Sequence, residues 1–92
     1  MKYAPLANYI NGNAVPTSGT TKDVISPVNG EVLSTVPLST EAELEAAVTA
    51  AKAAFASWST QTLRQRCDVF YRYRNLLQDN LDELSRICHE EN

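Results

Sequence analysis

The most constraining feature of this 92-residue chain is the uneven placement of the residues that interrupt helices. All three glycines and all four prolines precede residue 39, and none follows it. Glycine and proline mark turns and strand ends and break helices, so a long segment that lacks both can form continuous helix. The sequence therefore predicts turns and strands in residues 1–38 and helices in residues 39–92.

The first 38 residues contain turn dipeptides between short runs of strand-forming residues. Asn11-Gly12 favours a tight hairpin because both residues tolerate positive φ. Pro27 and Gly30 bracket a second turn, before a run rich in β-branched residues. The expected elements are strands at 8–10, 14–15, 22–25 and 31–37, an exposed loop at 17–21 and a turn at 27–30.

Capping signals predict three helices after residue 39. Thr40 and Glu43 form a capping box, and Thr62 and Gln65 form a second one, so a helix is expected to begin after each threonine. The second helix is expected to end just before Asn80. Asn80 is predicted to cap the third helix with its side chain.

Apolar residues at spacings of three, four and seven predict one buried face on each helix. On the first helix this stripe runs from Leu44 to Trp58 and includes several alanines, which allow another element to approach closely. The acidic end after His89 is interpreted as a solvated helix terminus. The residues of the third helix that are expected to point inward are Leu81, Leu84, Ile87 and Cys88.

No group of reactive side chains predicts a catalytic, cofactor-binding or metal-binding residue in this chain. Cys88 and His89 are adjacent, which places them about 100° apart on a helix and prevents a thiol–imidazole hydrogen bond. Cys88 is therefore interpreted as a core residue and His89 as a surface residue. One histidine and two distant cysteines do not supply a metal site, and no disulfide between Cys67 and Cys88 is expected. The glycines form no phosphate-binding loop.

Four arginines on the second helix raise the question of nucleic-acid binding. They lie on different sides of a helical wheel, and the net charge of −3 gives no general attraction to nucleic acid or to an anionic membrane. Arg64 and Arg72 are instead expected to pair with Asp68. Arg66 is interpreted as a structural anchor to another part of the protein, with a binding role as the alternative. The apolar arc in which Arg66 falls consists of Leu63, Phe70, Tyr73 and Leu77.

The order and spacing of these segments resemble the N-terminus of the aldehyde dehydrogenase superfamily. That family typically reads F-I-N-G, then N-P-A-T-G-E-V, then a hydrophobic strand, then A-V-x-A-A-x-x-A-F-x-x-W. The chain looks most like the CoA-acylating methylmalonate-semialdehyde dehydrogenase branch, and the resemblance covers about residues 7–92. The segments that carry it are Asn8–Gly12, Asp23–Pro27, Gly30–Leu33, Val36–Leu38, Ala47–Phe55, Trp58, Leu63–Arg66, Asp82–Leu84 and Glu90–Asn92.

The resemblance implies an N-terminal fragment of the NAD-binding domain of an α/β enzyme. The fragment itself would be α+β, with short strands and hairpins in residues 1–38 and three helices in residues 39–92. The parent would oxidise malonate or methylmalonate semialdehyde to an acyl-CoA, with NAD as cofactor and CoA as cosubstrate. The catalytic residues and the nucleotide-binding unit of the family lie beyond the first hundred residues, so neither Cys67 nor Cys88 takes the catalytic role. The 92-residue chain alone is expected to be inactive and to bind no cofactor or metal.

The partners implied by the resemblance are the remainder of the dehydrogenase chain and further copies of it, in a homodimer or homotetramer. Nucleic acid and membrane are not expected as partners. The expected location is the cytoplasm. No apolar segment approaches the roughly 20 residues of a membrane helix. A second hypothesis treats the chain as a stand-alone helical interaction module that associates through the Leu44–Trp58 stripe.

Overall fold

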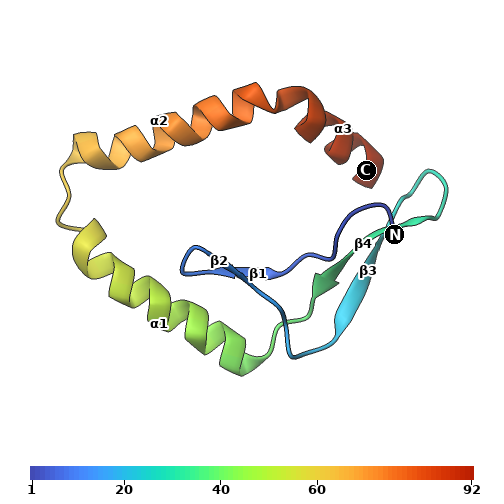
Figure 1. Ribbon diagram of the computed structural model, residues 1–92, viewed down its shortest axis with the longest axis horizontal. Coiled ribbons are helices and arrows are strands. Elements are labelled where there is room, and N and C mark those ends of the chain that lie inside the picture. Colours follow the sequence, from blue (N-terminus) through green and yellow to red (C-terminus); the bar gives the residue numbers. More distant parts are fainter.

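The computed structural model describes residues 1–92 and contains two antiparallel strand pairs followed by three helices (Figure 1). The α+β class predicted for the chain is confirmed, and every predicted strand and helix is present to within two residues. The elements are β1 (Asn8–Ile10), β2 (Asn13–Val15), β3 (Thr21–Ile25), β4 (Val32–Pro37), α1 (Glu41–Trp58), α2 (Leu63–Asp79) and α3 (Leu81–Glu91).

The first strand pair is the hairpin expected around Asn11-Gly12. Strands β1 and β2 pair with Tyr9 opposite Ala14. Asn11 and Gly12 have φ values of 51° and 76°, the left-handed region that a two-residue hairpin turn requires and that these residue types tolerate. The predicted turn is confirmed.

Strand β4 is the most enclosed element, because it is hydrogen-bonded along both edges. Strand β3 pairs with one edge, and the N-terminal segment runs along the other. The N–H of Tyr3 donates to the carbonyl of Leu33 over 2.7 Å, and the hydroxyl of Ser34 donates to the carbonyl of Ala4 over 2.7 Å. Leu33, Ser34 and Ser26 are the three buried residues of the chain. The core thus lies entirely in the strand region.

Both predicted capping boxes are present. At the start of α1, the N–H of Glu43 donates to the Thr40 hydroxyl and the Glu43 carboxylate accepts from the Thr40 N–H. Gln65 and Thr62 make the same reciprocal pair at the start of α2. These local bonds satisfy N–H groups that have no partner inside the helix.

The predicted side-chain cap of the third helix is wrong. Asn80 is the only residue between α2 and α3, and its side chain makes no capping bond to α3. Its amide group instead donates to the carbonyl of Leu76 over 2.8 Å. With no connecting loop, Asn80 ends α2 and also begins α3, where its backbone carbonyl accepts from the N–H of Leu84 at 3.0 Å.

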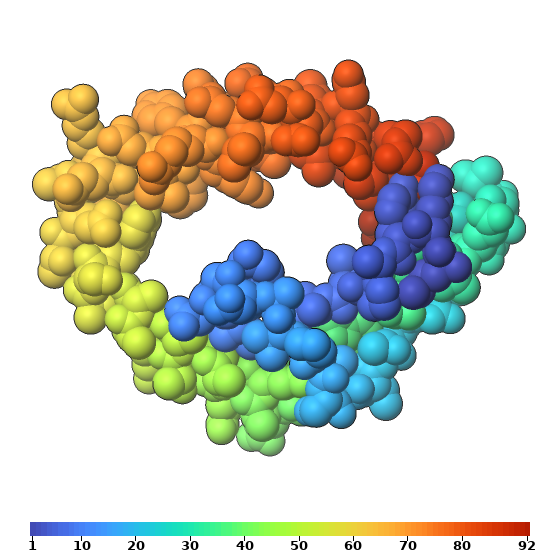
Figure 2. Space-filling view, in the orientation of Figure 1, coloured from blue at the N-terminus to red at the C-terminus, as the bar shows by residue number.

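The elements follow one another around an open ring, and the space-filling view shows an opening through its centre (Figure 2). The ring measures 48 × 35 × 16 Å, and its radius of gyration is 16.7 Å. A compact chain of this length has a radius of gyration of about 12 Å. The accessible surface is 7426 Å², against about 5,300 Å² for a compact monomer of this mass, an excess of about 2,100 Å².

The predicted burial of the helix faces is wrong within this chain. None of the three helices contains a buried residue, and the side chains of Leu44 and Phe55 are 62% and 66% exposed. The ring explains this exposure, because it brings no second layer of structure against the helices. No helix has the length and hydropathy to cross a membrane. On α3, Ile87 is half-buried, and the exposed residues that were predicted to point inward are Leu81, Leu84 and Cys88.

Candidate functional site

The first polar cluster ties the loop before β3 to the start of α1. The Glu43 carboxylate accepts the N–H of Ser18 at 2.6 Å, the N–H of Thr40 at 2.9 Å and the hydroxyl of Thr17 at 2.9 Å. The N–H of Ser18, followed by that of Thr40, lowers the pKa of Glu43 below its ordinary value. Glu43 therefore does more than cap a helix, because it also fixes a loop 25 residues earlier in the chain.

Gly19 allows this loop to approach the end of β4. A Cβ atom on Gly19 would lie 2.5 Å from the carbonyl oxygen of Leu38, too close for any side chain. The backbone N–H of Leu38 donates to the carbonyl of Thr20 over 2.8 Å. The loop that was predicted to be exposed is thus partly packed, with Thr17 and Gly19 half-buried.

The second polar cluster joins the N-terminus to the end of α3. The Glu90 carboxylate accepts from Lys2 Nζ at 2.8 Å, from Arg86 at 2.9 Å and from the Tyr3 hydroxyl at 2.6 Å. These donors, Lys2 foremost and then Tyr3, lower the pKa of Glu90 from 4.5 to about 2. The side chain of Glu90 is only 20% exposed. The interpretation of this acidic end as a solvated terminus is therefore wrong for Glu90.

The Glu90 cluster closes the ring across 88 residues of sequence. Beside it lies a pocket of about 270 Å³ between the N-terminal segment, the β3–β4 pair and α3. The pocket contains no pairing of a nucleophile with a base, and its walls are mainly apolar. The residues that line it are Tyr3, Leu6, Val24, Leu33, Ser34, Ile87 and Glu91.

The reactive side chains do not assemble into a catalytic or metal-binding group. Cys67 is half-buried, Cys88 is exposed, and both are free thiols. The interpretation of Cys88 as a core residue is therefore wrong, whereas His89 is on the surface as expected. No three His, Cys, Asp or Glu side chains lie together in a way that could hold a metal ion.

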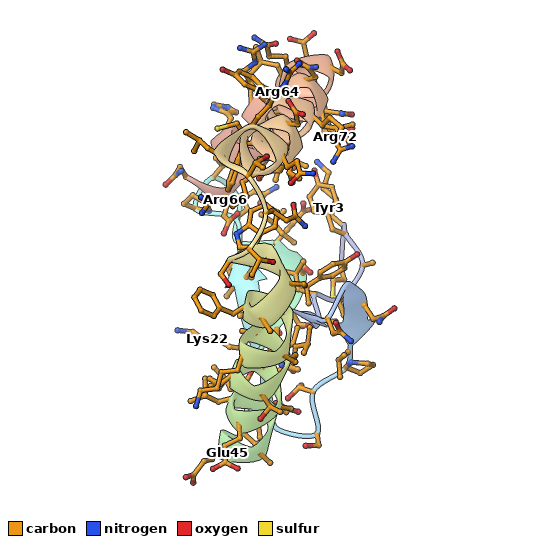
Figure 3. All side chains as sticks on the ribbon, turned by 90° about the vertical axis from the view of Figure 1, so that its left-hand side faces the viewer. Tyr3, Lys22, Glu45, Arg64, Arg66 and Arg72 are labelled. Carbon is orange, nitrogen blue, oxygen red and sulfur yellow. The ribbon has the colours of Figure 1, made fainter.

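The arginines of α2 are dispersed around the helix, as the helical wheel predicts. In Figure 3, Arg66 lies on the side of α2 nearest α1, whereas Arg64 and Arg72 lie elsewhere on the helix. The predicted pairing with Asp68 is wrong, because both ion pairs of the chain involve Glu90. Arg66 is half-buried, and its Nε atom is buried with no hydrogen-bond acceptor.

Sequence reasoning missed the N-terminal members of the ring closure. Lys2 and Tyr3 belong to no periodic pattern, and Glu90 lies near the other end of the chain. The one available signal is the Arg86–Glu90 spacing of four residues, which predicts a pair on the surface of α3. Nothing in that spacing indicates that Tyr3 joins the pair.

The sequence and the structure were compared with those of known proteins. A model of the aldehyde dehydrogenase family matches residues 14–92. Malonate-semialdehyde dehydrogenase 1 of Shouchella clausii (strain KSM-K16) is 44% identical over 86 residues, which cover 92% of this chain and 18% of that protein. Malonate-semialdehyde dehydrogenase 3 of Geobacillus kaustophilus (strain HTA426) is 46% identical over 88 residues, with 95% of this chain and 18% of that protein covered.

A solved structure shares the same arrangement of elements. It is a crystal structure assigned as methylmalonate-semialdehyde dehydrogenase from Sinorhizobium meliloti 1021, in complex with NAD. It superposes with a TM-score of 0.90 at 38% identity, covering 99% of this chain and 18% of the other. This chain thus spans about 18% of the length of each of these relatives. The predicted resemblance is confirmed, and the chain belongs to the aldehyde dehydrogenase family.

Proposed function

We propose that the chain is the N-terminal structural portion of an NAD-dependent aldehyde dehydrogenase that oxidises malonate or methylmalonate semialdehyde to an acyl-CoA. The observation that carries this proposal is the close superposition on a relative that is complexed with NAD, at a TM-score of 0.90 over 99% of the chain. The names of the two sequence relatives support the semialdehyde as substrate. CoA is proposed as cosubstrate from the resemblance to the acylating branch.

The role of this portion is architectural. Its polar clusters hold the ring together, while most of its large apolar side chains are exposed. Covering the excess surface of about 2,100 Å² requires polypeptide on the scale of a permanent interface. The remainder of the dehydrogenase is proposed as that partner, within a cytoplasmic homodimer or homotetramer.

The experiment is a comparison of NADH formation by the full-length enzyme and by the 92-residue chain. With NAD, CoA and either semialdehyde, the full-length enzyme is expected to form NADH and an acyl-CoA, and the isolated chain is expected to form neither. Product analysis by mass spectrometry separates an acyl-CoA from a free acid. NADH formation by the isolated chain would contradict the architectural role, and a free acid as sole product would contradict the acylating activity.

The exposed stripe from Leu44 to Trp58 favours one alternative, a stand-alone interaction module that associates through α1. In that case the 92-residue chain forms a stable complex through this face without the dehydrogenase. Sedimentation of the chain with and without Phe55→Glu distinguishes the two functions. An association that Phe55→Glu abolishes would support the module, since Phe55 is 66% exposed on that face.

A further inference from the structure

The most unusual polar atom of the chain is Arg66 Nε. It is buried, yet no hydrogen-bond acceptor reaches it. A buried N–H without an acceptor loses its hydration and gains nothing in return, which is why such groups are rare in folded proteins. Within these 92 residues, Arg66 Nε therefore lacks the hydrogen-bond acceptor that its burial requires.

The surroundings of Arg66 on α2 are apolar and uncovered. Leu63 and Phe70, which share its arc of the helix, are 71% and 65% exposed. Tyr73 and Leu77 extend the same arc and are also exposed. This Arg66 face, defined as Leu63, Arg66, Phe70, Tyr73 and Leu77, is an unpartnered helix face with a cation among its apolar residues. In Figure 3 Arg66 lies on the side of α2 that is nearest α1.

Covering this face would place the guanidinium of Arg66 in a medium of low dielectric constant. A charge that is removed from water in this way requires an opposite charge close by. The chain supplies none, because no carboxylate oxygen lies within 4 Å of an Arg66 nitrogen. A backbone carbonyl could accept the Nε–H bond but would leave the charge uncompensated. A carboxylate can accept from Nε and a terminal nitrogen together, side by side.

We propose that the Arg66 face is covered by an apolar segment from the remainder of the dehydrogenase chain, and that an Asp or Glu of this segment binds Arg66 through Nε. This inference rests on the proposed function. The chain corresponds to 18% of its relatives, so most of a family member's polypeptide lies outside these residues and is available to cover the face. The excess surface is large enough for such a segment. Arg66 is thus a positioning residue that fixes where this segment docks.

The first test locates the covering segment in the full-length enzyme. A photo-cross-linking residue in place of Phe70 is irradiated, and the joined peptides are identified by mass spectrometry. We expect a cross-link to residues of the same polypeptide beyond Asn92, in a peptide that contains Asp or Glu. The same probe in place of Arg72, on another side of α2, serves as the control and is expected to give a different peptide or none. A cross-link to a second subunit, or to a peptide without Asp or Glu, would overturn the proposal.

The second test asks whether Nε itself is used. In the full-length enzyme, Arg66→Lys and Arg66→Gln are each expected to lower the melting temperature by about 5 °C or more, because Gln removes the charge that pairs with the carboxylate and Lys lacks the Nε–H that donates to it. Arg72→Gln is the matched control and is expected to shift it by less than about 1 °C. Exchange of the two charges, with Arg66→Glu and the cross-linked acid changed to Arg, should restore part of the loss. A melting temperature unchanged by Arg66→Lys would overturn the assignment of Nε.

These outcomes are independent of the proposed activity. NADH formation by the wild-type enzyme is measured first and decides the proposed function alone. An active enzyme in which Arg66→Lys changes nothing retains the proposed function and refutes the docking contact. An enzyme without semialdehyde activity in which the cross-link and the charge exchange succeed refutes the substrate and retains the contact.

Discussion

The strand half (residues 1–38) and the helical half (residues 39–92) of this chain differ in how much of their surface is buried within the chain. The strand half contains all three buried residues, and β4 is hydrogen-bonded along both edges. In the helical half, α1 and α2 begin with capping boxes, but none of the three helices contains a buried side chain. Local hydrogen bonds thus define both halves, whereas fully buried residues are present only in the first.

The difference shows that a helix can be specified locally without being stabilised locally. Capping boxes and alanine-rich composition determine where α1 begins and that it is helical. Most helix stability in proteins nevertheless comes from burial of an apolar face, which α1 and α2 do not achieve within these residues. We therefore expect the helical half to depend on polypeptide outside these residues more than the strand half does.

The largest effect is expected from Phe55→Ala, which contrasts the chain with the complete enzyme. Phe55 is 66% exposed in the chain, so its truncation there should change the free energy of unfolding by less than about 0.5 kcal/mol. In the full-length enzyme the same residue is expected to be covered, and the loss should be about 3 kcal/mol or more. Denaturant unfolding of both proteins measures the difference, with Glu45→Gln as the control on the polar face of α1. A small loss of stability in both proteins would contradict the expectation that Phe55 is covered in the full-length enzyme.

A smaller but local effect is expected in the strand half from Gly19→Ala. The added Cβ would meet the carbonyl of Leu38 at 2.5 Å, and a clash with backbone is relieved only by moving the loop. We expect a loss of about 1–3 kcal/mol in the free energy of unfolding. Gly30 offers the matched contrast, because nothing lies within 4 Å of a Cβ added there and Asn is one of the few residues that adopt its φ of 76°, so Gly30→Asn should cost less than Gly19→Asn. Equal losses for Gly19→Asn and Gly30→Asn would refute the steric account.

A third variant, Glu43→Gln, tests the link between the two halves. Both carboxylate oxygens are used, one by the N–H of Ser18 and the other by the N–H of Thr40. An amide has a single acceptor oxygen, so one of these bonds must be lost. Gln65 shows that an amide sustains a capping box, so α1 should persist while the loop is released. Amide hydrogen exchange should be faster at Ser18 and unchanged in the middle of α1, and unchanged exchange at Ser18 would contradict this role.

The smallest effect is expected from acid at the ring closure. Glu90 has a pKa of about 2 in the folded chain and 4.5 ordinarily, so it binds fewer protons when folded. Its contribution to stability is therefore complete above about pH 4.5 and is lost as the pH falls toward 2. The effect should be modest, since the partners of Glu90 are exposed and screened by solvent. An NMR titration of the Tyr3 ring should follow this transition, and Glu90→Gln should abolish it.

The elements were predictable because their signals are local. Asn11-Gly12 specifies its hairpin and Thr40 with Glu43 specifies the start of α1, whatever the rest of the chain does. Asn80 is the N-cap residue of α3 as predicted, but its side chain binds the carbonyl of Leu76 at the end of α2, because a residue shared by two helices can serve either. Local chemistry cannot separate these two roles.

The contacts between distant segments were not predictable in the same way. Glu90 reads as an ordinary terminal acid, and only the fold brings Lys2 and Tyr3 to it. Cys88 lies on an apolar stripe, which predicts a core position, but it is exposed. An apolar stripe indicates which face of a helix tends to be buried, not whether this chain supplies the element that buries it. The half-burial of Arg66 among apolar residues was visible in the helical wheel, and its lack of an acceptor required the structure.

Hydrogen exchange of the helical half, in the isolated chain and in the full-length enzyme, tests the central claim most directly. If the helices depend on cover from outside these residues, amides in the middle of α1 and α2 should exchange far more slowly in the enzyme than in the chain. Amides of β4, which is enclosed on both edges, should differ less between the two. Equal protection of α1 and α2 in the isolated chain and in the enzyme would contradict the claim that this half is completed by the rest of the dehydrogenase.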